Sequence, residues 1–245
     1  EMKVSAPGFK GGDRTDIDLP AAQRNVLAAL KKAGKKIVFV NFSGSAMALA
    51  PEAGNCDAIL QAWYPGQAGG TAVADVLFGD YNPAGRLPIT FYKHTEQLPD
   101  FEDYSMQGRT YRYMKETPLF PFGYGLSYTT FSYKKLSIDP AGDVVRVSFT
   151  LKNTGKYEGD EVAQLYVKYQ GSDSQVKLPL KQLKGFERIH LKKGESKQIN
   201  LTVPKSELRF WNEEEGEFYT PAGDYLFMVG TASDAIQLQQ IVTLK

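Results

Sequence analysis

The spacing of the apolar residues changes near the middle of this 245-residue chain, and that change restricts the possible folds more than any other feature. In residues 128–245 apolar side chains fall on every second position, as at Val145, Val147, Phe149 and Leu151. A period of two is typical of a strand with one face in a core. Residues 1–91 instead show helical spacing and unbroken apolar runs, so we expect a different kind of layer there.

The first 91 residues predict helices that alternate with strands. A helix is expected to begin near Pro20, with Asp18 or Leu19 near the cap and Pro20 in the first turn, and to stop at Gly34. The apolar run Ile37–Val40 then indicates a strand that is buried on both faces. This alternation predicts an α/β layer.

A second strand over Ala58–Trp63, a glycine-rich turn and a helix over about Gly69–Phe78 complete this part. A glycine turn that leads into a helix can hold phosphate. Here the lysine of a nucleotide loop is missing, and PGQAGG does not keep the GxGxxG spacing. We therefore expect the glycines to allow close packing of strand and helix.

After residue 127, turn signals such as Asn153–Gly155 separate about seven short strands, which predicts a β-sandwich of immunoglobulin or fibronectin type III kind. Cys56 is the single cysteine, so the disulfide of a true immunoglobulin domain is excluded. Residues 92–127 have no clean period, yet they are rich in aromatic residues, unlike disordered segments. We expect domains over 1–91 and 128–245, joined by an ordered linker over 92–127.

The composition argues against several classes of partner. The net charge of +1 implies no basic surface for nucleic acid or an anionic membrane. No apolar run approaches the roughly 20 residues that span a bilayer. As a nucleophile Cys56 would need His94 or His190, and neither lies in a recognisable context, so a small buried residue is expected.

The carboxylates give no clear metal site. Asp16 and Asp18 have the spacing of a calcium loop, but the remaining ligands are missing. We expect Asp13, Asp16 and Asp18 to serve as caps and in an ion pair with Arg14, and we expect no metal or cofactor. The acidic clusters are interpreted as solvated faces; they cover residues 158–161 and 213–215.

Two aromatic pairs are candidates for contact with ligands or domains. Trp63 and Tyr64 end a predicted strand, and open α/β sheets bind ligands at the carboxyl ends of their strands. Sugar sites use aromatic faces and carboxylates, but a core position for Trp63 stays open as the alternative. Phe210 and Trp211 are expected in the core or at a domain interface.

Four stretches resemble glycoside hydrolase family 3. AILQAWYPGQAGGTAVADVLFGDYNPAGRLPITF (58–91) and GGDRTDIDLP (11–20) are similar to its C-terminal α/β sandwich. RTYRYM and PLFPFGYGLSYTTF (within 109–131) resemble its link to the last domain, and LKQLKGFERIHLKKGESKQINLTV (180–203) its fibronectin type III-like domain. The resemblance covers almost the whole chain and implies part of a β-glucosidase or β-xylosidase.

Family members retain the anomeric configuration, using an Asp nucleophile and a Glu general acid and base. The resemblance places the nucleophile in an N-terminal barrel that this chain lacks. The resemblance implies a general acid just before the segment 11–20, which favours a Glu before the chain begins, with Glu1 as the alternative. Arg14 and Asp16 match a motif that supports the sugar-site loop. We therefore assign no catalytic or substrate-binding residue within the chain.

The resemblance also implies partners and a location. We expect an N-terminal barrel of the same enzyme, a β-linked oligosaccharide, an additional copy of the chain as a possible partner, and a periplasmic or secreted location. The isolated chain should be inactive, and an incomplete α/β sandwich should leave apolar faces uncovered. The alternative is a non-catalytic module that binds carbohydrate or braces the enzyme. Bracing is favoured because the strands show no stripe of aromatic residues.

Overall fold

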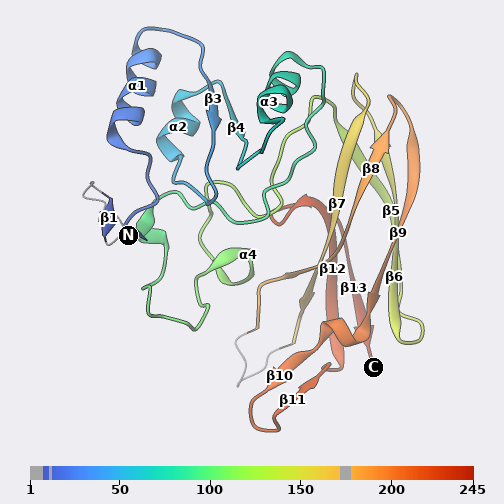
Figure 1. The fold of residues 1–245 in the computed structure, drawn as a ribbon. Coiled ribbons are helices and arrows are strands. Elements are labelled where there is room, and N and C mark those ends of the chain that lie inside the picture. Colours follow the sequence, from blue (N-terminus) through green and yellow to red (C-terminus); the bar gives the residue numbers. More distant parts are fainter. Residues whose placement is uncertain (1–7, 11–12, 172–177) are drawn as a thin grey trace. The chain divides into compact units, whose positions relative to one another are not determined.

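The computed structural model describes residues 8–10, 13–171 and 178–245. They divide into two compact units (Figure 1). The α/β unit comprises the chain up to Asp80, with Ile89–Arg109 and Lys115–Phe120; the sandwich unit comprises Tyr81–Pro88, Thr110–Met114 and Pro121–Lys245. The predicted linker is thus shared between the two units, while the domain boundaries at 91 and 127 stay a prediction.

The α/β unit is built around a parallel pair of strands, β3 and β4, with the short helix α2 between them in the chain. Parallel neighbours need a crossover connection, and α2 supplies it. The sequence analysis did not predict α2. The bounds are β1 Phe9–Lys10, β2 Asp13–Arg14, α1 Ala21–Lys32, β3 Val38–Asn41, α2 Ala50–Asn55, β4 Ala58–Gln61, α3 Gly69–Phe78 and a 3₁₀ turn at Thr95–Gln97.

Helix α1 lies close to its predicted position. It begins at Ala21, so Pro20 precedes the helix and does not lie in its first turn. Proline fits there because its fixed φ leads into a helix and it has no N–H to leave unpaired. Leu27 is buried, whereas Val26 is 59% exposed and Leu30 is 40% exposed. An apolar stripe of α1 is therefore only partly covered within the described residues.

Strand β3 departs from its prediction in one respect. Val38 is 53% exposed, so the strand is not buried on both faces as expected. In the described part of the chain β3 and β4 form a sheet of two strands. A parallel strand is buried on both faces only where helices or other elements pack on both faces, and at Val38 the described residues do not supply this. The apolar run does form a strand, but the described residues do not cover both faces of that strand.

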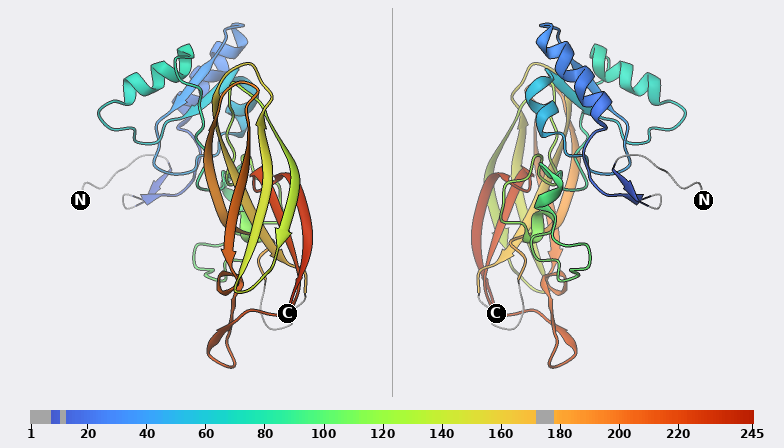
Figure 2. Two further views of the ribbon diagram at one scale, coloured as in Figure 1. Left: turned by 90° about the vertical axis from the view of Figure 1, so that its right-hand side faces the viewer. Right: turned by 90° about the vertical axis from the view of Figure 1, so that its left-hand side faces the viewer.

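The sandwich unit contains two antiparallel sheets. One has the strand order β5-β6-β9 and the other β13-β12-β7-β8. Figure 2 shows the strands of both sheets running lengthwise through the unit, with the β10–β11 hairpin beyond one end. The bounds are α4 Thr110–Tyr113, β5 Phe131–Asp139, β6 Val144–Asn153, β7 Gly159–Tyr169, β8 Gln182–Leu191, β9 Ser196–Pro204, η2 Lys205–Leu208, β10 Phe210–Asn212, β11 Glu217–Tyr219, β12 Gly223–Ala232 and β13 Ala235–Leu244.

The core of the sandwich confirms the predicted period of two. Val145, Val147, Phe149 and Leu151 are each at most 1% exposed. They pack with buried residues of the facing sheet, among them Phe227. Full burial of such a side chain contributes about 1.5–3 kcal/mol. The predicted fold class, an α/β part followed by a fibronectin-like β-sandwich, is therefore confirmed.

The acidic cluster at residues 158–161 is not the solvated face that was expected. Glu161 is 3% exposed and pairs with Arg86, while Asp160 binds His190 and Arg188. The physical reason is that Asp160 and Glu161 lie inside β7, which begins at Gly159, and Glu161 is on the same face as the buried residues Ala163 and Leu165. The cluster at 213–215 is exposed as expected.

None of the helices in the described ranges is long and apolar enough to cross a membrane.

Candidate functional site

The candidate site lies at the carboxyl ends of β3 and β4. Asn41 and Gln61 are register partners at the last position of the parallel pair. Asn41 Nδ2 donates to Gln61 Oε1 over 2.6 Å and to Ser43 Oγ over 3.0 Å. Gln61 Nε2 in turn donates to the Ser43 carbonyl oxygen over 3.1 Å. This polar network fixes the loops that follow both strands, at the edge where α/β sheets bind ligands.

Trp63 is the second residue of the loop after β4 and has an unusual backbone conformation. Its φ of 54° lies in the left-handed region, which a bulky residue rarely adopts. The ring is half-buried and meets Phe91 edge-on, with the ring centroids 6.1 Å apart. The packing compensates a strain of about 1–3 kcal/mol, and strain of this kind is often found at ligand sites. Packing thus holds Trp63 in place. Its half-buried position is intermediate between the two that the sequence suggests, in the core or in contact with a ligand.

Tyr64 and Phe42 are the exposed aromatic residues of this edge. Tyr64 is 79% exposed and Phe42 is 55% exposed. The Tyr64 ring lies against Gly44, because a Cβ atom there would be 2.5 Å from the ring carbon Cε2. The two loops therefore present aromatic surface to solvent beside a polar network, which suits a ligand that offers both C–H faces and hydroxyl groups.

The glycine-rich turn supports α3 and has no cationic side chain in the first turn of the helix. A Cβ atom on Gly69 would lie 2.4 Å from Pro65 Cγ, so only glycine fits against the turn. Gly70 has open space on that side, so the expected close packing holds at Gly69 and not at Gly70. The contact at Gly69 is with the turn and not with a strand.

The aspartates of the 13–18 segment are used in local structure. The Asp16 carboxylate accepts a hydrogen bond from the Asp18 N–H over 3.1 Å. Arg14 donates to the Asp18 carbonyl oxygen, and the Asp18 carboxylate lies 3.6 Å from Arg24 instead. The expected Asp–Arg pair therefore forms with Arg24 rather than with Arg14.

Arg24 also binds a carboxylate that the sequence analysis did not identify. Glu52 of α2 is 1% exposed and accepts a hydrogen bond from Arg24 Nε over 2.9 Å. That hydrogen bond raises the pKa of Arg24. The pair joins α1 to α2, so Glu52 is a structural residue. Asn41, Ser43 and Gln61 were also missed, although polar residues directly after the apolar runs VFV and AIL are a usable signal.

The remaining candidates are not brought together. Glu1 lies outside the described residues. Cys56 follows α2, and burial, with smaller contributions from Glu52 and Asp57, raises the pKa of its thiol, the opposite of what a nucleophile needs. His94 binds Glu96 and His190 binds Asp160. The carboxyl ends of β3 and β4 are thus the candidate site that the described chain offers.

Comparison with known proteins places the chain in a family. Residues 4–128 match the model of the glycosyl hydrolase family 3 C-terminal domain, and residues 161–233 match a fibronectin type III-like domain. The chain is 55% identical over 236 residues to a xylan 1,4-beta-xylosidase of Xylanibacter ruminicola. It is 39% identical over 244 residues to a periplasmic beta-glucosidase of Salmonella typhimurium.

The chain is shorter than these relatives. The match to the xylosidase covers 95% of this chain and 27% of that protein, and the match to the glucosidase 93% and 32%. The crystal structure of a beta-glucosidase from Kluyveromyces marxianus superimposes with a TM-score of 0.87 at 37% identity, over 96% of this chain and 30% of that one. The chain belongs to glycosyl hydrolase family 3, with the C-terminal domain of that family followed by a fibronectin type III-like domain.

Proposed function

We propose that this chain is the C-terminal part of a retaining glycoside hydrolase that cleaves β-linked xylosides or glucosides. The observation that carries the proposal is the 55% identity to a xylan 1,4-beta-xylosidase over 236 residues. Aryl β-xylosides are therefore the first substrates to test. The name of the Salmonella typhimurium relative supports a periplasmic or secreted location.

The proposed enzyme needs a second part. A retaining hydrolase uses two carboxyl groups about 5–5.5 Å apart, one of them as nucleophile. Three carboxylates before the end of β4 are already bound: Asp18 and Glu52 by Arg24, and Asp57 by Lys36 and the Ile37 N–H. We infer that an N-terminal barrel supplies the nucleophile and that the general acid is Glu1 or a Glu before it. Alone, the chain is inactive.

The uncovered apolar surface of the α/β unit supports the same proposal. Val38 in β3 and Val26 in α1 are each more than half exposed, and Phe78 at the end of α3 is 84% exposed. Parallel strands are normally covered on both faces. Further residues of the same enzyme would cover these side chains, and association with a second copy is the alternative cover.

A domain exchange tests the proposed function. We expect an active chimera when this chain replaces the matching 236-residue segment of the Xylanibacter ruminicola xylosidase. The chimera should hydrolyse an aryl β-xyloside at a rate comparable to the parent enzyme, and proton NMR should show the β-anomer of xylose as the first product. The isolated chain should show no turnover. A folded chimera without activity, or one that releases the α-anomer first, would contradict the proposal.

Tyr64 provides a prediction within the chimera. We expect Tyr64→Ala to raise KM for the aryl β-xyloside more than it lowers kcat, with kcat/KM reduced by about tenfold. The physical reason is that the exposed ring at the end of β4 packs on the sugar in the ground state and in the transition state alike. Steady-state kinetics measure the split between kcat and KM.

The matched control is Tyr104→Ala, because Tyr104 is also in the α/β unit and is 84% exposed but lies far from β4 in the chain. It should leave both constants unchanged. Equal constants for both variants and the unsubstituted chimera would show that Tyr64 does not contact the substrate.

A further inference from the structure

The β10–β11 hairpin carries a pair of aromatic side chains outside the core. Trp211 and Phe218 are cross-strand partners, with ring centroids 5.0 Å apart and ring planes at 70°. Trp211 is 45% exposed and Phe218 is 55% exposed. A core position, one of the two expected for Trp211, is therefore wrong. Two large exposed rings on one hairpin face are an uncommon feature of a surface and point to a binding role.

The hairpin holds the pair away from the sandwich. Side chains alternate along a strand, so Phe210 and Tyr219 face the side opposite to Trp211 and Phe218. Phe210 packs on Tyr169 of β7, with ring centroids 6.0 Å apart. Both views in Figure 2 show the hairpin projecting beyond the end of the sandwich strands. The inner face of the hairpin thus packs on the sandwich through Phe210, and Trp211 and Phe218 lie on the outer face.

The tip of the hairpin is ordered by its own hydrogen bonds. Asn212 Oδ1 accepts from the N–H groups of Glu214 and Glu215, over 3.0 and 3.3 Å. The Gly216 N–H donates to the Asn212 carbonyl oxygen over 2.9 Å. A fixed tip means that little conformational entropy is lost when a ligand binds, and such preorganisation favours affinity.

Charged groups surround the two rings. The Arg209 guanidinium lies over the Phe218 ring, 4.5 Å from its centroid. The exposed residues Glu213–Glu215 follow at the tip of the hairpin. Their negative charge exceeds the single positive charge of Arg209, so an anionic lipid surface or a nucleic acid would be repelled. Aromatic faces pack on the C–H faces of sugar rings, while carboxylates accept and the guanidinium donates hydrogen bonds to hydroxyl groups.

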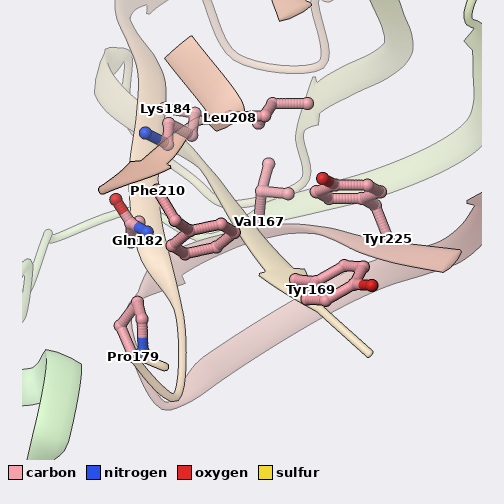
Figure 3. Close-up of a pocket in the computed structure, with 8 residues that line it drawn as sticks. All are labelled: Val167, Tyr169, Pro179, Gln182, Lys184, Leu208, Phe210 and Tyr225. Carbon is pink, nitrogen blue, oxygen red and sulfur yellow. The ribbon is translucent and has the colours of Figure 1, made fainter. Parts of the chain in front are cut away.

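The neighbouring pocket does not compete as the ligand site. It lies beneath the inner face of the hairpin, where Phe210 points toward Tyr169, Tyr225 and Val167 (Figure 3). Its cavity volume is about 10 Å³, which admits at most a single water molecule. A sugar ring therefore fits the outer surface of the hairpin and not the pocket.

We propose that Trp211, Phe218 and Arg209 form a surface site for a neutral β-linked glycan chain, xylan or glucan. The site would hold polymer near the enzyme without taking part in hydrolysis. The choice of glycan rests on the proposed function, whereas the site itself rests on the hairpin geometry. A protein partner is the other class of ligand that an exposed aromatic pair can bind, and the experiment separates the two.

Affinity gel electrophoresis of the 245-residue chain in soluble xylan and in soluble β-glucan tests the site. We expect one of these polymers to retard the chain, and Trp211→Ala and Phe218→Ala to weaken binding by roughly tenfold or more. Phe186→Ala is the matched control, because Phe186 is 65% exposed on β8 of the same unit. It should bind as the unsubstituted chain does.

Tryptophan fluorescence gives a second readout. The chain has two tryptophans, Trp63 and Trp211, so in the Trp63→Phe variant Trp211 is the reporter, and a xylohexaose or cellohexaose titration should change its emission. Circular dichroism checks that each variant is folded. No retardation by either polymer, or equal retardation of Trp211→Ala and the unsubstituted chain, overturns the proposal.

The two proposals fail separately. If the chimera is active and Trp211→Ala does not change its glycan binding, the surface site alone is overturned. An inactive chimera whose glycan binding is lost in Trp211→Ala overturns the proposed function alone. If Trp211→Ala lowers turnover of the small aryl β-xyloside without changing glycan binding, the hairpin contacts protein and the glycan proposal is overturned.

Discussion

Replacement of Glu161 by Gln is expected to lower the free energy of unfolding of the sandwich unit by about 3–5 kcal/mol. Glu161 Oε1 accepts a hydrogen bond from Arg86 over 2.9 Å, and the two side chains are 4% and 8% exposed. The neutral amide would leave the guanidinium charge buried without its counter-charge. Removing one partner costs more free energy than the intact pair contributes to stability, because folding has already removed the hydration of both charged groups.

The surroundings of this pair increase the expected effect. The second contact of Glu161 Oε1 is the Val162 N–H, over 2.9 Å. The hydroxyl of Tyr133 is buried nearby; burial first, and then the charge of Glu161, raise the pKa of Tyr133. The other acceptor of Arg86 among the described contacts is the Gly85 carbonyl oxygen, over 3.0 Å, which carries no negative charge. Urea unfolding of the full chain, followed by circular dichroism and, in a Trp63→Phe background, by the fluorescence of Trp211, measures the loss.

Two further variants make this prediction specific. Asp139→Asn breaks the pair of Asp139 with Arg146, in which both side chains are 60% exposed, and should cost less than about 1 kcal/mol. Replacing both buried partners, as Arg86→Met with Glu161→Leu, should recover most of the stability. If Glu161→Gln costs no more than Asp139→Asn, the buried pair is not the cause of stability that we infer.

Glu161 also shows what the sequence contained and what was overlooked. Ala163, Leu165 and Val167 are buried on the same face of β7, and residue 161 has the same parity. The period of two therefore predicts an inward-facing carboxylate, and an inward charge needs a partner. The partner, however, is Arg86, 75 residues earlier in the chain, and no local pattern predicts a contact at that separation.

The segment around Arg86 illustrates the same limit. Asn82 Nδ2 donates to the Glu158 carbonyl oxygen, and Asn82 Oδ1 accepts from Ser127 Oγ and from the Tyr128 N–H. The resemblance of residues 58–91 to the family's α/β sandwich puts residues 81–88 in the first predicted domain, and that boundary stays a prediction. By its contacts the segment groups with the sandwich unit, through long-range pairing that periodicity does not encode.

The candidate site was predictable in its position but not in its details. A strand, a glycine turn and a helix locate Trp63 and Tyr64 at a sheet edge, and the structure places them there. The network of Asn41, Ser43 and Gln61 depends on the register of two parallel strands, which the sequence does not specify. The left-handed backbone at Trp63 contradicts its local preference and is maintained by packing on Phe91.

Replacement of Asn153 by Ala is expected to destabilise the sandwich unit by about 3–5 kcal/mol. The substitution removes hydrogen bonds to groups that folding has buried, so those groups are left unpaired. Asn153 is fully buried. Its Nδ2 donates to the carbonyl oxygens of Tyr157 and Leu191, over 2.8 and 3.1 Å. Its Oδ1 accepts from Thr129 Oγ1 and from the Gly155 N–H, over 2.8 and 3.0 Å. All four hydrogen-bonding positions of the amide are therefore used.

Gly155 lies in the same turn, and its surroundings leave no room for a side chain. The segment Asn153–Gly155 therefore marks a contact between two strands as well as a turn. A Cβ atom on Gly155 would lie 2.6 Å from the Thr130 N atom, which the backbone cannot vacate easily. The amide and the glycine together hold the start of β5 against the end of β6. Loss of the amide should thus loosen the junction as well as leave unpaired groups.

A pH series on Asn153→Asp separates the lost hydrogen bonds from a cavity. Aspartate has nearly the shape of asparagine, but its charged form faces two carbonyl oxygens with no N–H to donate. Burial raises the folded-state pKa of such a carboxyl above its unfolded value, so the penalty is present at neutral pH and decreases as the pH falls through that folded pKa. The exposed Asn200→Asp on β9 should show no such pH dependence relative to the unsubstituted chain. Equal stability of Asn153→Asp and the unsubstituted chain at neutral pH would rule out the role of the amide donors; a loss in Asn153→Ala alone would then reflect the missing volume.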